Sequence, residues 1–177
     1  MLAFLFVIFA VAFRFLPHPY TFTPVAAALL FFGARGPRRL FWVPVALLIA
    51  SDLILTPFVY SYPLSPDHFV TWAWYGAIVL LGSALRNNAK PLRLLGASLT
   101  ASVSFFLLSN FAVWAVWKMY PKTLSGLAAA YDAGIPFFRH EVAGDLLFTA
   151  AMFGTPVLIQ AIHKARGEVQ ADRIASA

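Results

Sequence analysis

Cysteine is absent from this chain of 177 residues. Its absence excludes disulfide bonds, thiolate metal sites and cysteine nucleophiles. Charged residues are also scarce, at 11%, whereas 61% of the residues are hydrophobic. Soluble proteins carry roughly a quarter of charged residues, and a soluble domain of this length could not bury so much apolar surface. The composition therefore predicts an integral membrane protein.

The sequence also lacks the motifs of common enzyme classes. It contains no HExxH pair for zinc, no GxSxG nucleophile elbow and no glycine-rich phosphate loop of the Walker type. None of its histidines falls in the middle of an apolar run, where a haem ligand would lie. These histidines are His18, His68, His140 and His163. We therefore predict no enzymatic activity, no cofactor and no metal site, so any energy for transport would come from a partner or a gradient.

Apolar runs separated by short polar turns predict an all-α integral membrane protein rather than a β-barrel, which would show alternating strands. We expect six transmembrane helices in one domain over residues 1–163, followed by a polar cytoplasmic tail over 164–177. The second span is short enough to be partly re-entrant. The first lacks a basic residue before it, which favours an uncleaved anchor over a signal peptide. The expected spans are about 2–16, 22–34, 40–59, 69–85, 94–117 and 143–163.

A proline-broken corner follows the first span. Pro17, Pro19 and Pro24 each remove a backbone donor and disfavour helical geometry in the residue before them. Irregular backbone at membrane depth is tolerated only where it is buried in protein or lines a cavity. Arg14, in the last turn of the first span, either extends to the interface or is a buried cation that faces the bundle.

The longest connection is predicted over residues 118–142. Apolar residues recur at helical spacing from Leu124 to Tyr131, and Gly134 and Pro136 are expected to end that helix. An amphipathic helix on the membrane surface and a lid over a site are both consistent with this pattern.

The basic residues indicate the orientation, because cytoplasmic loops are enriched in lysine and arginine. With six spans and both termini cytoplasmic, nine of the thirteen lysines and arginines lie inside. The net charge of +6 therefore indicates topology rather than nucleic-acid binding. We expect a multi-pass protein of the bacterial cytoplasmic (inner) membrane. The nine are Arg35, Arg38, Arg39, Arg86, Lys90, Arg93, Lys164, Arg166 and Arg173.

Polar groups from four predicted spans share the outer half of the membrane. At 1.5 Å per residue, Asp52 lies about 18 Å and Asn110 about 24 Å above the inner face, while Arg14 and Asp145 lie at the outer face. We predict an outward-facing pocket in which Arg14 balances Asp52 or Asp145. Asn110 and the aromatic residues would then contact a small molecule. A structural polar network that only fixes helix register is the alternative. The aromatic and corner residues of this layer are Trp114, His18 and Tyr20.

Several segments together resemble a known family. They are the corner LPHPYTFTPVAAA, the turn GARGPRR and a third span ending in SD. This order resembles the substrate-binding S-components of energy-coupling-factor (ECF) vitamin transporters. It is still closer to small uncharacterised bacterial membrane proteins grouped with them, in which we expect SNFAVW, YPKTLSGLAAAY and IPFFRHEVAGDL.

The resemblance implies a six-helix bundle that binds a vitamin-like small molecule near the outer face for uptake. It assigns binding to Asn110, Trp114, Tyr131 and Asp145, under covers formed by the 60–68 and 118–142 segments. S-components dock through small residues to a coupling subunit driven by ATPases. Ala46 and Ala50 form such a pair here, whereas the first span has none, so a solitary protein is also consistent. The alternative function is a structural or assembly subunit of a larger membrane complex.

Overall fold

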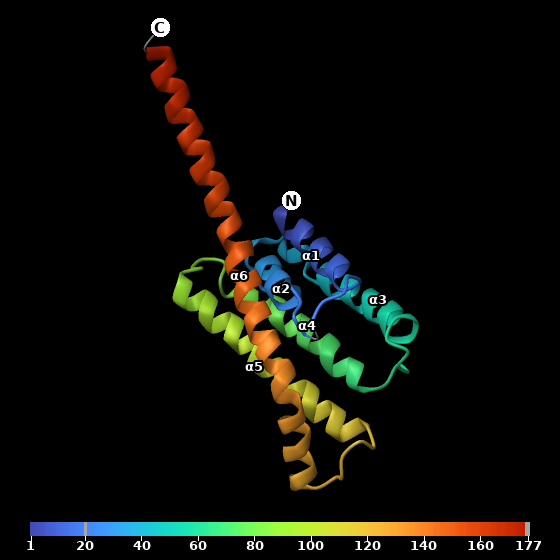
Figure 1. Cartoon of the computed structure of the whole chain (residues 1–177). Helices are drawn as coiled ribbons and strands as arrows, with labels where there is room; N and C mark the ends of the chain where they lie inside the picture. The colour runs from blue at the N-terminus through green and yellow to red at the C-terminus, as the bar shows by residue number, and fades with distance from the viewer. Residues whose placement is uncertain (20, 176–177) are drawn as a thin grey trace.

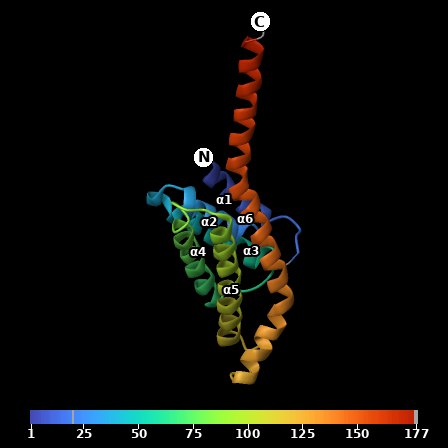
Figure 2. The same cartoon turned by 90° about the vertical axis from the view of Figure 1, so that its left-hand side faces the viewer.

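The computed structural model describes the backbone of residues 1–19 and 21–175, and side chains up to Arg166. Within these residues the fold is all-helical, as the sequence predicts (Figure 1). Five α-helices form a bundle, and the sixth runs along it and leaves it at its C-terminal end (Figures 1 and 2). The elements are α1 (Leu2–Phe13), α2 (Val25–Arg35), the 3-10 turn η1 (Arg38–Leu40), α3 (Trp42–Phe58), α4 (Asp67–Ser83), α5 (Pro91–Val116) and α6 (Leu124–Ala175).

Three helical segments are long and apolar enough to span a membrane: Arg38–Phe58, Pro91–Val116 and Leu124–Arg166. By contrast, α1 has 12 residues and α2 has 11. At 1.5 Å per residue they measure about 18 and 17 Å, well short of a hydrocarbon core of about 30 Å. The first two helices are therefore shorter than the spans predicted over 2–16 and 22–34, and neither is long enough to cross such a core alone.

The short helix α2 lies at the centre of the bundle. Every residue from Val25 to Ala34 is buried, and the helix packs against α1, α4 and α6. Its C-terminal carbonyls are bound by Arg86, which donates to the oxygens of Gly33 at 3.0 Å and Gly36 at 2.7 Å. A cation at this end of a helix also interacts favourably with the helix dipole. The surrounding helices thus shield α2, which is too short to span a membrane alone.

The contact between α2 and α4 is a close approach of two backbones. A Cβ atom added at Gly33 would overlap the backbone of Val79 and Gly82, and one added at Gly82 would overlap the backbone of Leu30. Small residues permit this spacing, which is a common device in helix packing within membranes. The position of α2 in the bundle therefore depends on both glycines.

The structure corrects the predictions for the C-terminal third. The helix predicted from Leu124 does not end at Gly134 and Pro136, because α6 continues without a break from Leu124 to Ala175 and includes the predicted span over 143–163. Its 52 residues measure about 78 Å. Pro136 and Gly134 lie inside it and do not end it. The prediction was wrong because these residues break isolated helices, whereas extensive packing against α5 maintains α6 through them.

The irregular corner between α1 and α2 is confirmed. No helix forms between Arg14 and Pro24 in the part of the chain described, which excludes Tyr20. Thr21 has a positive φ of 63°, and its hydroxyl donates to the carbonyl oxygen of Phe137 in α6 at 2.6 Å. This bond joins the corner to the first third of α6, where a cavity lies.

Candidate functional site

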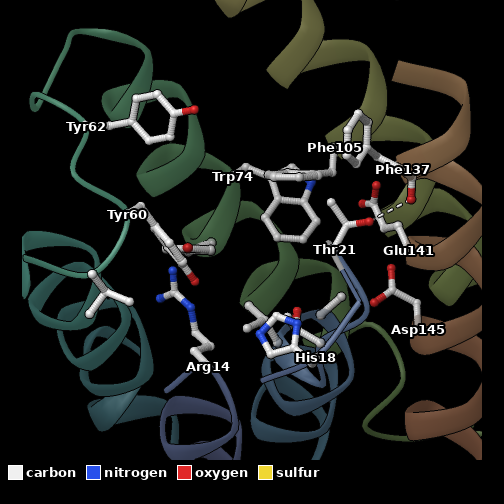
Figure 3. Close-up of a pocket in the computed structure, with 15 residues that line it drawn as sticks. Arg14, His18, Thr21, Tyr60, Tyr62, Trp74, Phe105, Phe137, Glu141 and Asp145 are labelled. Carbon is white, nitrogen blue, oxygen red and sulfur yellow. Dashed lines mark hydrogen bonds between the residues drawn. The ribbon is translucent and has the colours of Figure 1, made fainter. Parts of the chain in front are cut away.

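A cavity of about 840 Å³ lies among the corner, the α3–α4 loop and helices α4, α5 and α6 (Figure 3). One group of its lining residues is polar or charged, a second is aromatic and a third is aliphatic. The first group is Arg14, His18, Thr21, Thr23, Glu141 and Asp145. The second is Tyr60, Tyr62, Trp74, Tyr75, Phe105 and Phe137, and the third is Val25, Ala26 and Val59.

Arg14 forms an ion pair with Asp52 of α3. Its guanidinium group also donates to the hydroxyl of Ser51 and, at 3.4 Å, to the carbonyl oxygen of Leu48. Of the two partners that the sequence left open for Arg14, the structure selects Asp52. The alternative that Arg14 is a buried cation facing the bundle agrees with its side-chain exposure of 13%.

Asp52 accepts hydrogen bonds from α4 as well. The indole of Trp72 donates to it at 2.9 Å and the hydroxyl of Tyr75 at 3.2 Å. Asp52 is buried and is not among the residues that line the cavity. Arg14, Asp52, Trp72 and Tyr75 thus form a polar cluster, the Asp52 node, which joins α1, α3 and α4. These contacts agree with the alternative predicted from the sequence, in which a polar network fixes the packing of the helices.

Glu141 and Asp145 lie one turn apart on α6 and form an acidic wall opposite Arg14 (Figure 3). They are only 7% and 3% exposed. Asp145 accepts a hydrogen bond from Ser102 of α5 at 2.7 Å. Within the described part of the chain, neither carboxylate has a basic side chain within 4.0 Å, and Glu141 has no hydrogen-bond partner in the protein. Burial of a charge without a partner is costly.

Aromatic side chains form much of the remaining surface of the cavity. The Trp74 indole donates to the hydroxyl of Ser104 at 2.9 Å and packs against the Phe105 ring at 4.8 Å between centroids. Because its N–H already has a partner, Trp74 presents an aromatic surface to the cavity rather than a donor. The exposed residues Tyr60 and Tyr62 come from the α3–α4 loop, so part of the predicted 60–68 cover does border the cavity.

Residues 1–166 match the model of a protein family described as a family of unknown function (DUF6580). The chain belongs to this family. No curated protein and no solved structure shows significant similarity to it. The function of this DUF6580 member must therefore be inferred from its own residues.

His18 of the DUF6580 chain lies at the edge of the cavity, as expected for the corner. Its ring stacks on Phe13 at 5.4 Å between centroids. Its Nδ1 atom lies 2.8 Å from the carbonyl oxygen of Pro19, and a carbonyl can only accept, so Nδ1 carries the proton. The Nε2 atom remains for another partner. Tyr20, predicted beside it, lies outside the described residues.

Three predicted binding residues of the DUF6580 chain lie elsewhere, toward the far ends of α5 and α6. Asn110 donates to the carbonyl oxygen of Phe106 at 2.8 Å, Trp114 to that of Pro121 at 2.8 Å, and Tyr131 to that of Leu107 at 3.0 Å. None of the three lines the cavity. The Tyr131 bond connects α6 to α5, the Trp114 bond holds the turn between them, and the Asn110 bond lies within α5.

Glu141 is one of the cavity residues that the sequence prediction missed, together with Trp74, Tyr75, Phe105 and Phe137. The prediction placed it in a connection, whereas in the DUF6580 structure it lies four residues before Asp145 on one helix. Residues four apart share a helix face. The spacing of four residues between these two acids is the signal that would have identified the pair.

Proposed function

We propose that this DUF6580 protein is a membrane protein that binds a small molecule in the cavity between the Asp52 node and the acidic wall. One observation carries the proposal: the cavity is lined by a buried carboxylate, Glu141, that has no partner within the described protein. Cavities of roughly 300–1,000 Å³ with aromatic walls and a few polar groups are typical of small-molecule sites. The cavity volume of about 840 Å³ falls in that range.

The proposal includes a membrane orientation. The bundle would be an inner-membrane unit of six helices with both termini cytoplasmic and the cavity facing outward. Two features support it: the predicted charge bias, and the position of the N-terminus toward the same end of the molecule as the C-terminal end of α6 (Figures 1 and 2). Because α1 and α2 are short, they would form a pair embedded among longer helices rather than two full crossings.

The orientation can be tested by labelling, because the chain has no cysteine. Leu64 in the α3–α4 loop and Asn87 after α4 are both exposed. In intact cells, a membrane-impermeant maleimide is expected to label Leu64→Cys. It should label Asn87→Cys only after the membrane is opened. The reverse pattern would contradict an outward-facing cavity.

Uptake of a vitamin-like molecule, in the manner of an S-component, is the role that we propose for this binding. Ala46 and Ala50 are exposed on α3, and Ala46 borders an apolar groove between α3 and α4. This surface would contact an ECF-type coupling subunit with its ATPases, if such a subunit is present. Otherwise the protein would act alone.

Native mass spectrometry of the protein, extracted gently from its own membrane, tests the binding function. We expect a bound small molecule in the wild-type protein and its loss in Thr23→Trp, because that indole would project into the cavity that Thr23 lines. Thr100→Trp is the matched control, since Thr100 is exposed on α5 and does not line the cavity. A bound molecule that survives Thr23→Trp, or a wild-type protein without one, would count against the proposal.

A structural or assembly subunit of a larger complex is the second candidate. The Asp52 node favours it, because its bonds fix the packing of three helices without requiring a ligand. In the same experiment, this role predicts an empty cavity together with copurifying membrane subunits other than a coupling subunit and ATPases.

A further inference from the structure

The charges around the cavity are unbalanced. The guanidinium group of Arg14 is matched by Asp52, which leaves Glu141 and Asp145 without a basic partner. Among the described residues, the other ion pair is between Asp67 and His68, and neither of these lines the cavity. His18 lines the cavity at its edge, and its Nδ1–H is directed to the oxygen of Pro19. The described residues that line the cavity therefore supply two carboxyl groups and no unmatched arginine or lysine.

Glu141 is the more informative of the two acids. It is 93% buried by surface area, which follows from its exposed fraction of 7%, and it borders the cavity (Figure 3). Asp145 has the hydroxyl of Ser102 as a donor, whereas Glu141 has no donor among the described residues. A carboxylate held away from bulk water is destabilised unless a proton, a cation or a hydrogen-bond donor compensates it. A ligand in the cavity can provide that partner.

The aromatic walls complement a positive charge as well. The Trp74 ring and the Phe105 ring pack together at 4.8 Å between centroids, and both line the cavity. A cation over the face of an aromatic ring is attracted by the ring quadrupole, by about 0.5–2 kcal/mol. The same surface accepts the apolar body of a ligand. A cavity with both acidic and aromatic walls suits a compound that has a positive charge and an apolar body.

We propose that the cavity selects a small organic cation, with an ammonium or amidinium group against Glu141 and Asp145 and an apolar or aromatic body against Trp74 and Phe105. The inference rests on the proposed binding function and names its ligand class. An anionic ligand would meet two unmatched acids, while Arg14, the only arginine among the described residues that line the cavity, is held by Asp52.

A divalent metal ion fits less well than an organic cation. Magnesium and calcium take six or more oxygen ligands, and zinc usually takes three or four protein ligands. No group of three histidine, aspartate or glutamate side chains converges within the described residues. Much of the cavity is also apolar, which suits the body of an organic molecule.

Three probes of nearly equal shape and different charge test the inference: benzamidine, benzamide and benzoate. Binding to the purified full-length protein in lipid nanodiscs would be measured by isothermal titration calorimetry. Benzamidine is expected to bind about tenfold more tightly than benzamide, because a charge-assisted hydrogen bond contributes about 1.5–3 kcal/mol. Benzoate is expected to bind most weakly. Equal binding of the three probes, or tighter binding of benzoate, would overturn the inference.

Variants of Glu141 locate the effect. Glu141→Gln keeps the shape and removes the charge, so it should weaken benzamidine about tenfold while leaving benzamide unchanged. Glu141→Asp keeps the charge and should weaken benzamidine binding less than Glu141→Gln does. If benzamidine binds Glu141→Gln as tightly as wild type, Glu141 does not select the cation. The unfolding temperature of each variant, measured without probe, shows whether the protein remains folded.

The molecule that copurifies with the wild-type protein separates the two proposals. A bound organic cation supports both the binding function and the ligand class. A bound neutral or anionic molecule keeps the binding function and overturns the cation inference. Absence of any bound molecule, together with failure of all three probes to bind, overturns both.

Discussion

Asp52→Ala is expected to lower the unfolding temperature of the protein sharply. The substitution leaves the guanidinium group of Arg14 without its counter-ion and removes the acceptor of the Trp72 and Tyr75 donors. Removing one partner of a buried ion pair typically costs about 3–5 kcal/mol. That cost is a large part of the stability of an ordinary domain. Thermal unfolding in detergent, followed by intrinsic tryptophan fluorescence, would measure the change.

A double variant provides the control. Arg14→Met/Asp52→Leu removes both charges and replaces them with apolar groups, and replacing a complete buried pair is often neutral or stabilising. The double variant should therefore unfold at a higher temperature than Asp52→Ala, which reveals the coupling between the two sites. If Asp52→Ala instead unfolds like the wild type but loses its bound molecule, Asp52 contacts the ligand and the Asp52 node is not structural.

Gly82→Val is expected to disrupt folding as strongly, for a steric reason. A side chain at this position would overlap the backbone of Leu30 in α2. Overpacking costs about 1–3 kcal/mol where side chains can adjust, and more where they cannot. Because the obstacle is backbone, α2 and α4 would have to separate. The yield of monodisperse protein in size-exclusion chromatography and its unfolding temperature would both fall.

Gly76→Val, on the same helix, is the matched control. A Cβ at Gly76 meets no atom within 4 Å, so the substitution tests valine in α4 without the clash. We expect its unfolding temperature and yield to remain near those of the wild type. Equal losses in the two variants would mean that the α2–α4 approach does not explain the effect.

The Arg14–Asp52 pair shows what the sequence predicts well. Arg14 and Asp52 both lie within predicted apolar spans, and an unpaired ionisable group in a membrane is costly. Each was therefore expected to have a partner of opposite charge. The proline-broken corner followed from the same kind of constraint, since three prolines in eight residues leave no room for a helix. The first prediction depends on the need of a buried charge for a counter-ion, and the second on the number of prolines in a short segment.

The sixth helix shows where local rules fail. Gly134 and Pro136 end most isolated helices, but here the contact of α5 with α6 continues past both. At Gly134 the helices approach so closely that an added Cβ would contact the side-chain amide of Asn110. Proline and glycine within a helix are common in membranes, where neighbouring helices provide the missing contacts. The spacing of residues in the sequence does not show that α5 will pack beside Gly134 and Pro136.

The site was predicted only in part, because depth does not specify position around the helix or the length of its neighbours. Asn110 and Asp52 were assigned to one layer from the rise per residue. However, α5 has 26 residues and is much longer than α1, which has 12. Asn110 lies in α5, five residues beyond Phe105, which borders the cavity. At 1.5 Å per residue this is about 7.5 Å. The predicted polar groups therefore lie in three separate places: the Asp52 node, the acidic wall and the contact between α5 and α6.

The central claim is that the cavity beside Glu141 holds a small molecule. It is tested most directly by an electron cryo-microscopy or crystal structure of the protein extracted from its own membrane without added ligand. The account predicts non-protein density between Glu141 and Trp74, with a polar group within about 3 Å of the Glu141 carboxylate. A cavity filled only by water, or closed by movement of α6 so that Glu141 bonds to the protein, would contradict it.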